Sequence, residues 1–267
     1  MLWAMQSHYF DWLVPDWPAP PHIQAVCTTR QGGVSQGIYA GLNLGTHVGD
    51  VLQAVQANRQ RLQETIGARA VFLNQVHGTH VQAVDRHSED SVDADAAITE
   101  QSGIACTVMV ADCLPVLFCD VQGRRVLAAH AGWRGLLGVD GQGVLERSVA
   151  AMEEGISTSG PPDREHLLAW LGPCIGPQAF EVGDEVREAF MATSTDSADC
   201  FKQVRPGKWL ADLPALAKQR LAALGIERTF GNDSSQAWCT VADPSRFFSH
   251  RRDRVSGRMA ACIWRLD

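Results

Sequence analysis

Three residues that can bind a metal or act as nucleophile and base stand where apolar, strand-like runs end. They are His77 in NQVHG, Cys113 in ADCLP and His130 in AAHAGWRG. In sheets flanked by helices, strand ends are where sites collect. Histidine and cysteine are good zinc ligands, and three protein ligands with a fourth position left for water is the pattern of a catalytic zinc. These residue types predict a metal triad, with a Cys–His catalytic pair as the alternative.

The spacing of the three residues does not choose between these alternatives. Gaps of 36 and 17 residues separate them, which is too long for a short-range zinc clamp. Each residue also has a purely structural explanation. His77 could cap a hairpin, Cys113 could be a buried small hydrophobe, and His130 could bond a backbone carbonyl. From the pattern alone, the metal triad, the Cys–His pair and the structural roles all stay open.

Two arginines lie beside glycine-rich loops. TTRQGG contains Arg30 and HAGWRG contains Arg134. Glycine lets a backbone approach a ligand closely, and a loop that leads into a helix presents free N–H groups to an anion. The guanidinium adds a bidentate fork for phosphate or carboxylate. We expect anion ligands at these positions, the alternative being ordinary strand-to-helix turns with solvated arginines.

A third group of residues joins aromatic and basic side chains in FFSHRRD (247–253). Phe248 and His250 could stack on a planar base while the neighbouring arginines hold an anion. The alternative is an amphipathic loop with a buried Phe-Phe pair. Two carboxylates are acid–base candidates: Asp95 in DADAAIT and Asp112, which precedes Cys113.

Alternating strand and helix patterns must position these residues. Strands are predicted at 23–30, 70–77, 80–85, 104–112, 116–121, 125–130, 167–172 and 258–266, and helices at 51–66, 142–153, 183–190 and 212–225. The pair 70–77 and 80–85 is expected to form a hairpin. Asp50 and Asp212 are expected N-caps, Gly67 and Gly155 helix ends, and 156–166 and 193–208 surface loops. Close strand neighbours favour an α/β fold with a mixed sheet flanked by helices.

Composition and length describe an ordinary globular chain. It has 267 residues, a net charge of −7 and 45% hydrophobic residues. The charge argues against nucleic acid as a partner, and no apolar run is long enough to cross a membrane. The first residues lack the pattern of a signal peptide, and the eight cysteines form no C-x-x-C motif. We expect a soluble, cytoplasmic monomer or homodimer, with residues 1–22 as a lead-in and 23–267 as a single catalytic domain.

Several segments together resemble a known family. TTRQGGVSQG, LNQVHGTHV, DADAAIT, TVMVADCLPVLFCD, AAHAGWRG and RFFSHRRDRVSGRMA look like the polyphenol oxidase family, now regarded as purine nucleoside phosphorylases. The resemblance runs from about residue 23 to 266. It implies a single α/β domain similar to the putative cysteine hydrolase fold group. It also implies a zinc ion, with copper as the alternative, held by His77, Cys113 and His130. His250 stands where the family more often has tyrosine.

The resemblance also implies an activity. Members are credited with phosphorolysis of adenosine, inosine and methylthioadenosine to the free base and (methylthio)ribose 1-phosphate, and with deamination of adenosine. These are transferase and hydrolase reactions. Arg30, Asn43 and Arg134 would then contact phosphate, ribose or base. Two rivals stay open. One is a metal-free Cys–His hydrolase of a cell-wall (peptidoglycan) precursor, with Cys113 as nucleophile and His130 as base. The other is a copper-dependent polyphenol oxidase (laccase), although one His/Cys/His set cannot supply several copper sites.

Overall fold

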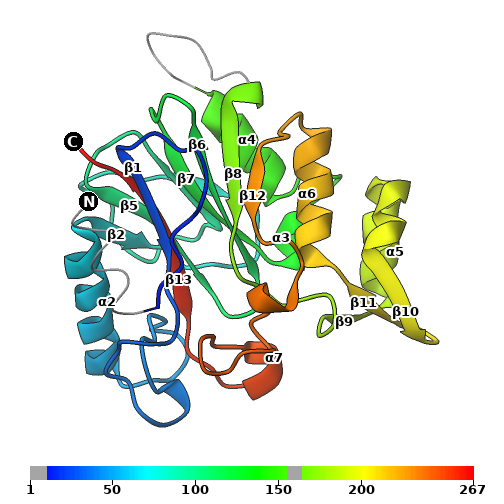
Figure 1. Ribbon diagram of the computed structural model, residues 1–267, viewed down its shortest axis with the longest axis horizontal. Helices are drawn as coiled ribbons and strands as arrows, with labels where there is room; N and C mark the ends of the chain where they lie inside the picture. Colours follow the sequence, from blue (N-terminus) through cyan, green and yellow to red (C-terminus); the bar gives the residue numbers. More distant parts are fainter. Residues whose placement is uncertain (1–10, 155–163) are drawn as a thin grey trace.

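Two β-sheets lie face to face, with helices on their outer faces, in a computed structural model that describes residues 11–154 and 164–267 (Figure 1). The first sheet contains, in spatial order, β1 (Ile23–Cys27), β13 (Met259–Arg265), β5 (Ile104–Val110) and β2 (Arg69–Phe72). The second contains β12 (Thr229–Gly231), β8 (Leu167–Leu171), β6 (Leu114–Asp120), β7 (Val126–Ala131), β4 (Ala96–Thr99) and β3 (Val81–Ala83). The predicted α/β fold with helix-flanked mixed sheets is confirmed.

Both sheets mix parallel and antiparallel pairs. The pairs β2–β5, β3–β4 and β12–β8 are parallel, and the others in these two sheets are antiparallel. β5 and β6 are buried along their whole length, which explains their almost continuous apolar sequences. Side chains between the sheets, such as Val108, Leu117 and Trp170, form one core.

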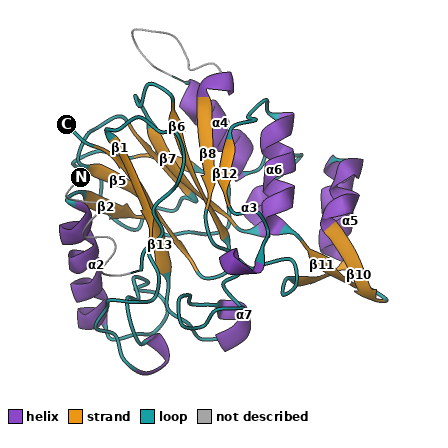
Figure 2. Ribbon diagram, viewed as in Figure 1, coloured by secondary structure: helices purple, strands orange, loops and turns teal. Residues whose placement is uncertain are grey.

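Helices cover the two outer faces. α2 (Leu52–Ile66) packs on the first sheet through a cluster that contains Leu62 and Trp264. α4 (Val144–Glu153) and α6 (Leu213–Ala223) pack on the second sheet. Figure 2 shows this order of helix, sheet, sheet and helix from one side of the molecule to the other. The remaining short helices are α3 (Trp133–Leu137), α7 (His250–Asp253), η2 (Gly37–Tyr39), η3 (Arg164–His166), η4 (Thr195–Cys200) and η5 (Gln236–Trp238).

A small arm projects beyond α6 (Figure 1). It combines α5 (Asp184–Thr193) with a three-stranded sheet of β10 (Phe201–Arg205), β11 (Lys208–Ala211) and β9 (Glu181–Gly183). The prediction of a surface loop at 193–208 is therefore wrong. Four of the five β10 residues are exposed, so the strand carries no apolar pattern that the sequence could reveal. The predicted loop at 156–166 and the helix end at Gly155 fall largely outside the described residues.

The predicted hairpin of 70–77 and 80–85 is also wrong. β2 pairs with β5 in the first sheet, whereas β3 pairs with β4 in the second. The chain between them crosses from one sheet to the other, so its Gly78-Thr79 step is a crossover and not a hairpin turn. This crossover carries His77.

Of the three predicted helix ends that lie in the described residues, the structure confirms two. Gly67 ends α2 in the left-handed conformation, with φ of 65°. Asp212 caps α6, because its side chain accepts a hydrogen bond from the Ala215 N–H at 2.9 Å. Asp50 does not cap α2, contrary to the prediction. Its carboxylate instead accepts hydrogen bonds from the Ser35 hydroxyl and the Asn43 amide, which join the loop 35–50 together.

Replacing Asp212 with alanine will destabilise the fold. The substitution removes the α6 cap and the acceptor of the Ser234 hydroxyl, which lies 2.8 Å from the carboxylate. We expect the free energy of unfolding in urea to fall by about 1–2 kcal/mol. Glu188→Ala, an exposed acidic change on α5, is the matched control and should stay within about 0.5 kcal/mol of the parent. Equal stability of the two variants would remove the capping role of Asp212.

Two general features accompany this fold. Among the helices of the described segments, none combines the length and apolar character needed to cross a membrane. All eight cysteines are free thiols, and seven of them are buried. Cys113 is the exception, which sets it apart from thiols that act as small hydrophobes.

Candidate active site

The three residues that the sequence singled out come together at one end of the sheets. His77 lies in the crossover after β2, Cys113 in the turn between β5 and β6, and His130 in β7. Their ligand atoms all lie within 4.8 Å of one another. Cys113 Sγ is 3.7 Å from His77 Nε2, and the two imidazole rings stand edge-on at 74° with centroids 4.9 Å apart. The prediction that these side chains form a group able to bind a metal is confirmed.

A buried carboxylate holds two of the three in place. Asp95 Oδ1 accepts hydrogen bonds from His130 Nδ1 at 2.8 Å and from the His77 N–H at 3.0 Å. Its Oδ2 accepts from the N–H groups of Val76 at 3.2 Å and Gly78 at 2.6 Å. These bonds stabilise the crossover, in which His77 takes a left-handed backbone with φ of 59°. Asp95 therefore positions the residues around it.

Charges in this group shift one another's pKa values. Burial would raise the pKa of Asp95, but the hydrogen bond and charge of His130 and the neighbouring backbone N–H groups lower it, so this carboxylate is ionised. The His130 Nδ1 must then carry the proton that Asp95 accepts, so Nε2 is the nitrogen that can bind a metal once it has lost its own proton. Burial would lower the pKa of His130, but the Cys113 charge and the Asp95 hydrogen bond raise it to about 9.

The pKa of the Cys113 thiol shifts in the opposite direction to that of His130. Burial would raise the pKa of Cys113, but the charge of His130 and hydrogen bonds from both histidines outweigh it and lower this pKa to about 6. A thiolate at neutral pH is both a metal ligand and a nucleophile. The group is therefore competent for either of the two chemistries that the sequence left open.

The turn that carries Cys113 is tied to the C-terminal loop. Asp112 has a left-handed backbone, with φ of 95°, and its side chain is buried. One carboxylate oxygen accepts from the Thr240 hydroxyl and the other from the Arg251 N–H, both at 2.6 Å. With both oxygens engaged in this way, Asp112 fixes the shape of the turn.

Glycines in AAHAGWRG make room for the site. A Cβ on Gly132 would lie 2.8 Å from His77 Cδ2 and 3.0 Å from Cys113 Sγ. A Cβ on Gly135 would lie 2.7 Å from the Gly78 carbonyl oxygen. Real Cβ atoms do not come this close to their neighbours, so both positions require glycine for the chain to pack against the His77 crossover.

Gly132→Ala will consequently displace His77 and Cys113. We expect the affinity for zinc to fall at least about tenfold, as when the surroundings of metal ligands are disturbed. The measurement is a competition titration against a chromophoric chelator. Gly141→Ala is the control, because its Cβ would meet no atom within 4 Å although its φ of 74° strains the backbone. An equal loss in both variants would mean that general destabilisation, and not the contact with the ligands, lowers the affinity.

A cavity of about 410 Å³ opens beside the three residues. This volume is within the usual range of small-molecule sites. One set of lining residues is apolar or aromatic: Met109, Ala111, Trp133, Ile175, Phe180 and Leu213. The other set is polar: His47, Gln75, His77, Asp112, Cys113, His130, His250, Arg251, Arg254 and Arg258. The cavity therefore offers a ligand both an apolar, aromatic surface and a polar, cationic surface.

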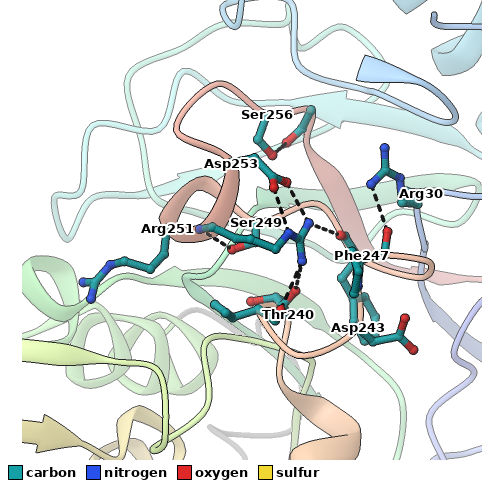
Figure 3. A network of polar contacts seen from close by, with 12 residues as sticks. Arg30, Thr240, Asp243, Phe247, Ser249, Arg251, Asp253 and Ser256 are labelled. Carbon is teal, nitrogen blue, oxygen red and sulfur yellow. Dashed lines mark hydrogen bonds and ion pairs between the residues drawn. The ribbon is translucent and has the colours of Figure 1, made fainter. Parts of the chain in front are cut away.

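Among the predicted ligand-binding residues outside the metal group, His250 lines this cavity and Arg30, Arg134 and Phe248 do not. Arg30 donates to the carbonyls of Pro244 and Ala40, and its guanidinium lies 4.6 Å from the centre of the Phe248 ring. In Figure 3, Arg30 points to the loop that precedes α7. Phe248 is fully buried, and Arg134 is exposed and stacks on Trp133. We therefore move the predicted anion role away from Arg30 and Arg134.

Asn43 also lies outside the cavity lining, but it connects to it. Its side chain is fully buried, and its Oδ1 accepts hydrogen bonds from the N–H groups of Gly45 and Arg258. The second bond fixes the backbone of a cavity arginine. Asn43 thus acts on the site through Arg258, without facing the cavity itself.

Four polar cavity residues were not predicted as site residues: His47, Gln75, Arg254 and Arg258. Arg251 was included among the arginines of FFSHRRD, but the orientation of its side chain depends on Arg252. That guanidinium bonds Asp253 and the carbonyls of Thr240 and Phe247, as the network in Figure 3 shows. Because Arg252 fixes α7, Arg251 extends the opposite way, toward the Glu181 carbonyl of β9.

Known proteins resemble this chain over almost its whole length. A family model described as "Multi-copper polyphenol oxidoreductase laccase" matches residues 24–266. "Purine nucleoside phosphorylase PA4543" of Pseudomonas aeruginosa is 47% identical over 257 residues, covering 96% of this chain and 99% of the relative. "Purine nucleoside phosphorylase YfiH" of Escherichia coli is 47% identical over 254 residues, covering 94% and 98%.

Solved structures agree with these relatives. The crystal structure of Neisseria meningitidis protein NMB0706 matches with a TM-score of 0.88 and 44% identity, covering 96% of this chain and all of that one. YlmD from Geobacillus stearothermophilus matches with a TM-score of 0.86 and 31% identity, covering 96% of each chain. The two bacterial relatives named above are both called purine nucleoside phosphorylases. Because the family model, these relatives and the shared fold agree, the chain belongs to the multi-copper polyphenol oxidoreductase laccase family.

Proposed function

We propose that the protein is a zinc-dependent purine nucleoside phosphorylase that cleaves adenosine, inosine and methylthioadenosine to the free base and (methylthio)ribose 1-phosphate. The observation that carries this proposal is the meeting of His77, Cys113 and His130 at a cavity with an apolar, aromatic side and a cationic side. The names of the relatives at 47% identity support the same activity. A cytoplasmic location is part of the proposal, and the free state of the eight thiols agrees with it.

The lining residues match the parts of the substrates. Trp133 and Phe180 offer aromatic surface to the purine, and Ile175 and Leu213 offer apolar surface to a methylthio group. Phosphorolysis forms a bond from a phosphate oxygen to ribose C1′ and breaks the bond from C1′ to the purine nitrogen. The departing base keeps the electron pair and takes up a proton. Cationic residues in the cavity would hold the phosphate and stabilise the charge that develops.

The donor set fits zinc. Two imidazole nitrogens and one thiolate are standard zinc ligands, with a fourth position left open in catalytic sites. Ligand atoms about 2.0–2.3 Å from a tetrahedral metal lie about 3.5 Å from each other, and the 3.7 Å from Cys113 Sγ to His77 Nε2 agrees with this spacing. When bound in such a site, zinc supplies Lewis acidity and hydroxide at neutral pH. That chemistry would also serve the adenosine deamination that we include in the proposal.

Copper suits the same donors, but a multicopper oxidase mechanism does not suit this chain. In the ranges 11–154 and 164–267, His77, Cys113 and His130 form the one group of three or more potential ligands that could hold a metal ion. A multicopper mechanism requires several such groups. We therefore place a laccase activity last among the candidates.

A Cys–His hydrolase of a cell-wall precursor is the second candidate. Its support is the order Cys113, His130 and Asp95, in which a thiol of lowered pKa contacts an imidazole that a carboxylate orients. This arrangement is also that of a cysteine nucleophile, base and orienting group. Chelation separates the two candidates. A hydrolase would keep its activity without metal and lose it on thiol alkylation, whereas the proposed phosphorylase loses activity on chelation.

The most informative assay is phosphate-dependent release of hypoxanthine from inosine by the zinc-loaded protein. We expect release with phosphate, formation of ribose 1-phosphate in equal amount, and no release without phosphate. Inosine should be replaced by adenosine and methylthioadenosine in parallel, with liberated ammonia measured for adenosine. Absence of base release from all three nucleosides, with the metal site filled, would reject the phosphorylase and favour the hydrolase.

A further inference from the structure

Among the described residues, the cavity lining contains more arginines than carboxylates. Arg251, Arg254 and Arg258 line it, and Asp112 is the one acidic residue of the lining. Both oxygens of Asp112 already accept hydrogen bonds, from the Thr240 hydroxyl and the Arg251 backbone. This excess of positive charge occurs in a protein whose net charge is −7, so it is a local feature of the cavity.

Arginines elsewhere in the described ranges show what a structural arginine does in this protein. Arg220 pairs with Glu146 at 3.0 Å, and Arg125 pairs with Glu100. None of the ion pairs within residues 11–154 and 164–267 includes a cavity arginine. Guanidinium groups that converge on one cavity without a carboxylate partner offer their N–H donors to an anionic ligand.

Arg258 is held so that part of its guanidinium stays available. Its Nη1 donates to the carbonyls of Ser256 at 2.9 Å and Gly257 at 3.1 Å. No hydrogen bond from Nε or Nη2 to another described residue is present. Burial lowers the pKa of Arg258, while the charges of Cys113 and Asp112 oppose this effect, so the guanidinium lies within electrostatic reach of the metal-binding group. Its backbone is fixed by Asn43.

Arg254 reaches the same cavity from a strained backbone. Its φ of 65° is unusual for a residue with a side chain, and its N–H donates to the His250 carbonyl at 2.8 Å. No hydrogen bond or ion pair joins its side chain to the described residues. The Arg252 network of Figure 3 holds α7, and therefore the backbone from which Arg254 projects. Strained positions of this kind concentrate at functional sites.

Arg251 differs from these two. Its Nη1 donates to the carbonyl of Glu181 at 3.0 Å, and its guanidinium lies over the Phe180 ring, 5.5 Å from the centroid. It thus joins α7 to the arm that starts at β9. The groups left with donors for a ligand are those of Arg254 and Arg258, with His47 beside them. Burial and the charges of Arg258 and Arg59 lower the pKa of His47, so it adds a neutral imidazole.

We propose that Arg254 and Arg258 form an oxyanion site that binds phosphate next to His77, Cys113 and His130. This assignment rests on the proposed function for its place in catalysis, and it replaces Arg30 and Arg134 as the anion ligands. Two sources share this ligand chemistry: free inorganic phosphate, and the phosphate ester of the product ribose 1-phosphate. An arginine pair can hold either through bidentate hydrogen bonds.

Titration of the zinc-loaded protein with inorganic phosphate alone, followed by calorimetry, tests the site without any nucleoside. We expect Arg258→Ala to raise the Kd for phosphate about 10- to 100-fold, as loss of a hydrogen bond to a charged group does. Arg258→Lys, which keeps the charge and loses the fork, should have a smaller effect. Arg254→Ala should raise the Kd about 3- to 10-fold, because Arg254 is exposed and its charge is screened.

Arg147→Ala is the matched control. Arg147 is an exposed arginine on α4 that does not line the cavity, so the Kd should stay within about twofold of the parent. Arg254→Ala should fold normally, because the Arg254 side chain makes no hydrogen bond or ion pair with the described residues. A weaker phosphate Kd in this variant therefore does not come from misfolding. A second titration with ribose 1-phosphate separates the sources. A loss confined to inorganic phosphate assigns the site to the substrate, and a loss for both ligands means that the product phosphate stays on the same arginines.

Two outcomes overturn the proposal. One is a parent protein that binds no inorganic phosphate at millimolar concentration. The other is a phosphate Kd that changes less than twofold in both Arg254→Ala and Arg258→Ala. A third outcome separates this site from the proposed function: if phosphate binds, the variants weaken it and no nucleoside is cleaved, then the oxyanion site stands and the phosphorylase does not.

Discussion

Cys113→Ala, His77→Ala and His130→Ala will each reduce the zinc content of the purified protein from about one ion per chain to near zero. Each substitution leaves two of the three ligands that converge within 4.8 Å. Two ligands do not form a stable zinc site in a cavity open to water, because zinc in proteins retains at least three protein ligands. Elemental analysis after dialysis checks the result, and phosphorolysis of inosine should disappear in parallel.

Matched variants separate ligand loss from general damage. His87→Ala removes an exposed histidine outside the group, and Cys200→Ala removes a buried thiol at the end of η4. Both should retain about one zinc per chain. Circular dichroism should show that all five variants fold. Full zinc loading in the three ligand variants would contradict the metal centre and direct attention to the Cys–His pair.

Chelation gives an independent measure of the same site. A metal that binds the folded chain and not the unfolded one stabilises the fold, so its removal should lower the melting temperature of the parent. The ligand variants should melt at the same temperature with and without chelator. If the melting temperature of the parent protein is the same with and without chelator, the folded state does not bind a metal at this site.

The parts of the fold with strong apolar patterns could be predicted from the sequence. β5, β6, β7 and β13 are buried strands whose side chains fill the space between the sheets or beneath the helices. α6 was predictable for a different reason, because Asp212 and the following Leu-Pro form a standard helix start. In these segments, local preference and tertiary burial favour the same conformation.

Prediction failed where tertiary partners decide the outcome. β2 and β3 follow each other closely in sequence, yet each finds its partner in a different sheet. β4 was not predicted as a strand at all, although it lies between β3 and β7. Asp50 has the right residue type for a cap, but the Ser35 hydroxyl and the Asn43 amide compete for its carboxylate. Such partners are distant in sequence, so a local pattern does not contain them.

In the candidate site, too, some residues could be predicted from the local sequence and others could not. His77, Cys113 and His130 were identifiable because polar residues at the ends of apolar strands are unusual. The proposed anion ligands were not identifiable, since Arg30 and Arg258 are both arginines near glycine. Only the folded chain distinguishes them, because Arg30 donates to the Pro244 and Ala40 carbonyls outside the cavity, whereas Arg258 lines it. The sequence likewise identified Asp95 only as an acid–base candidate. Its hydrogen bonds to His130 and the His77 crossover, which make it a positioning group, appear only in the structure.

Asp95→Asn will weaken zinc binding although Asp95 is not a ligand. The asparagine has the same shape, but its amide N–H₂ would face backbone N–H donors in place of an acceptor. The charge-assisted hydrogen bond that orients His130 would also be lost. We expect zinc affinity to fall about 10- to 100-fold, the usual effect of removing a group that orients a ligand. The free energy of unfolding should fall by about 3 kcal/mol, because a buried charge network is broken.

The control for Asp95→Asn is Asp93→Asn, which makes the same change in charge two residues away. Asp93 is exposed and accepts a hydrogen bond from the Asn74 amide, outside the site. Its zinc affinity should match the parent. A general acid at position 95 would behave differently, because Asp95→Asn would then lower kcat at full zinc occupancy. If that is observed with unchanged zinc affinity, Asp95 takes part in proton transfer, and if affinity falls as expected, its four hydrogen bonds to the His77 crossover and His130 explain why.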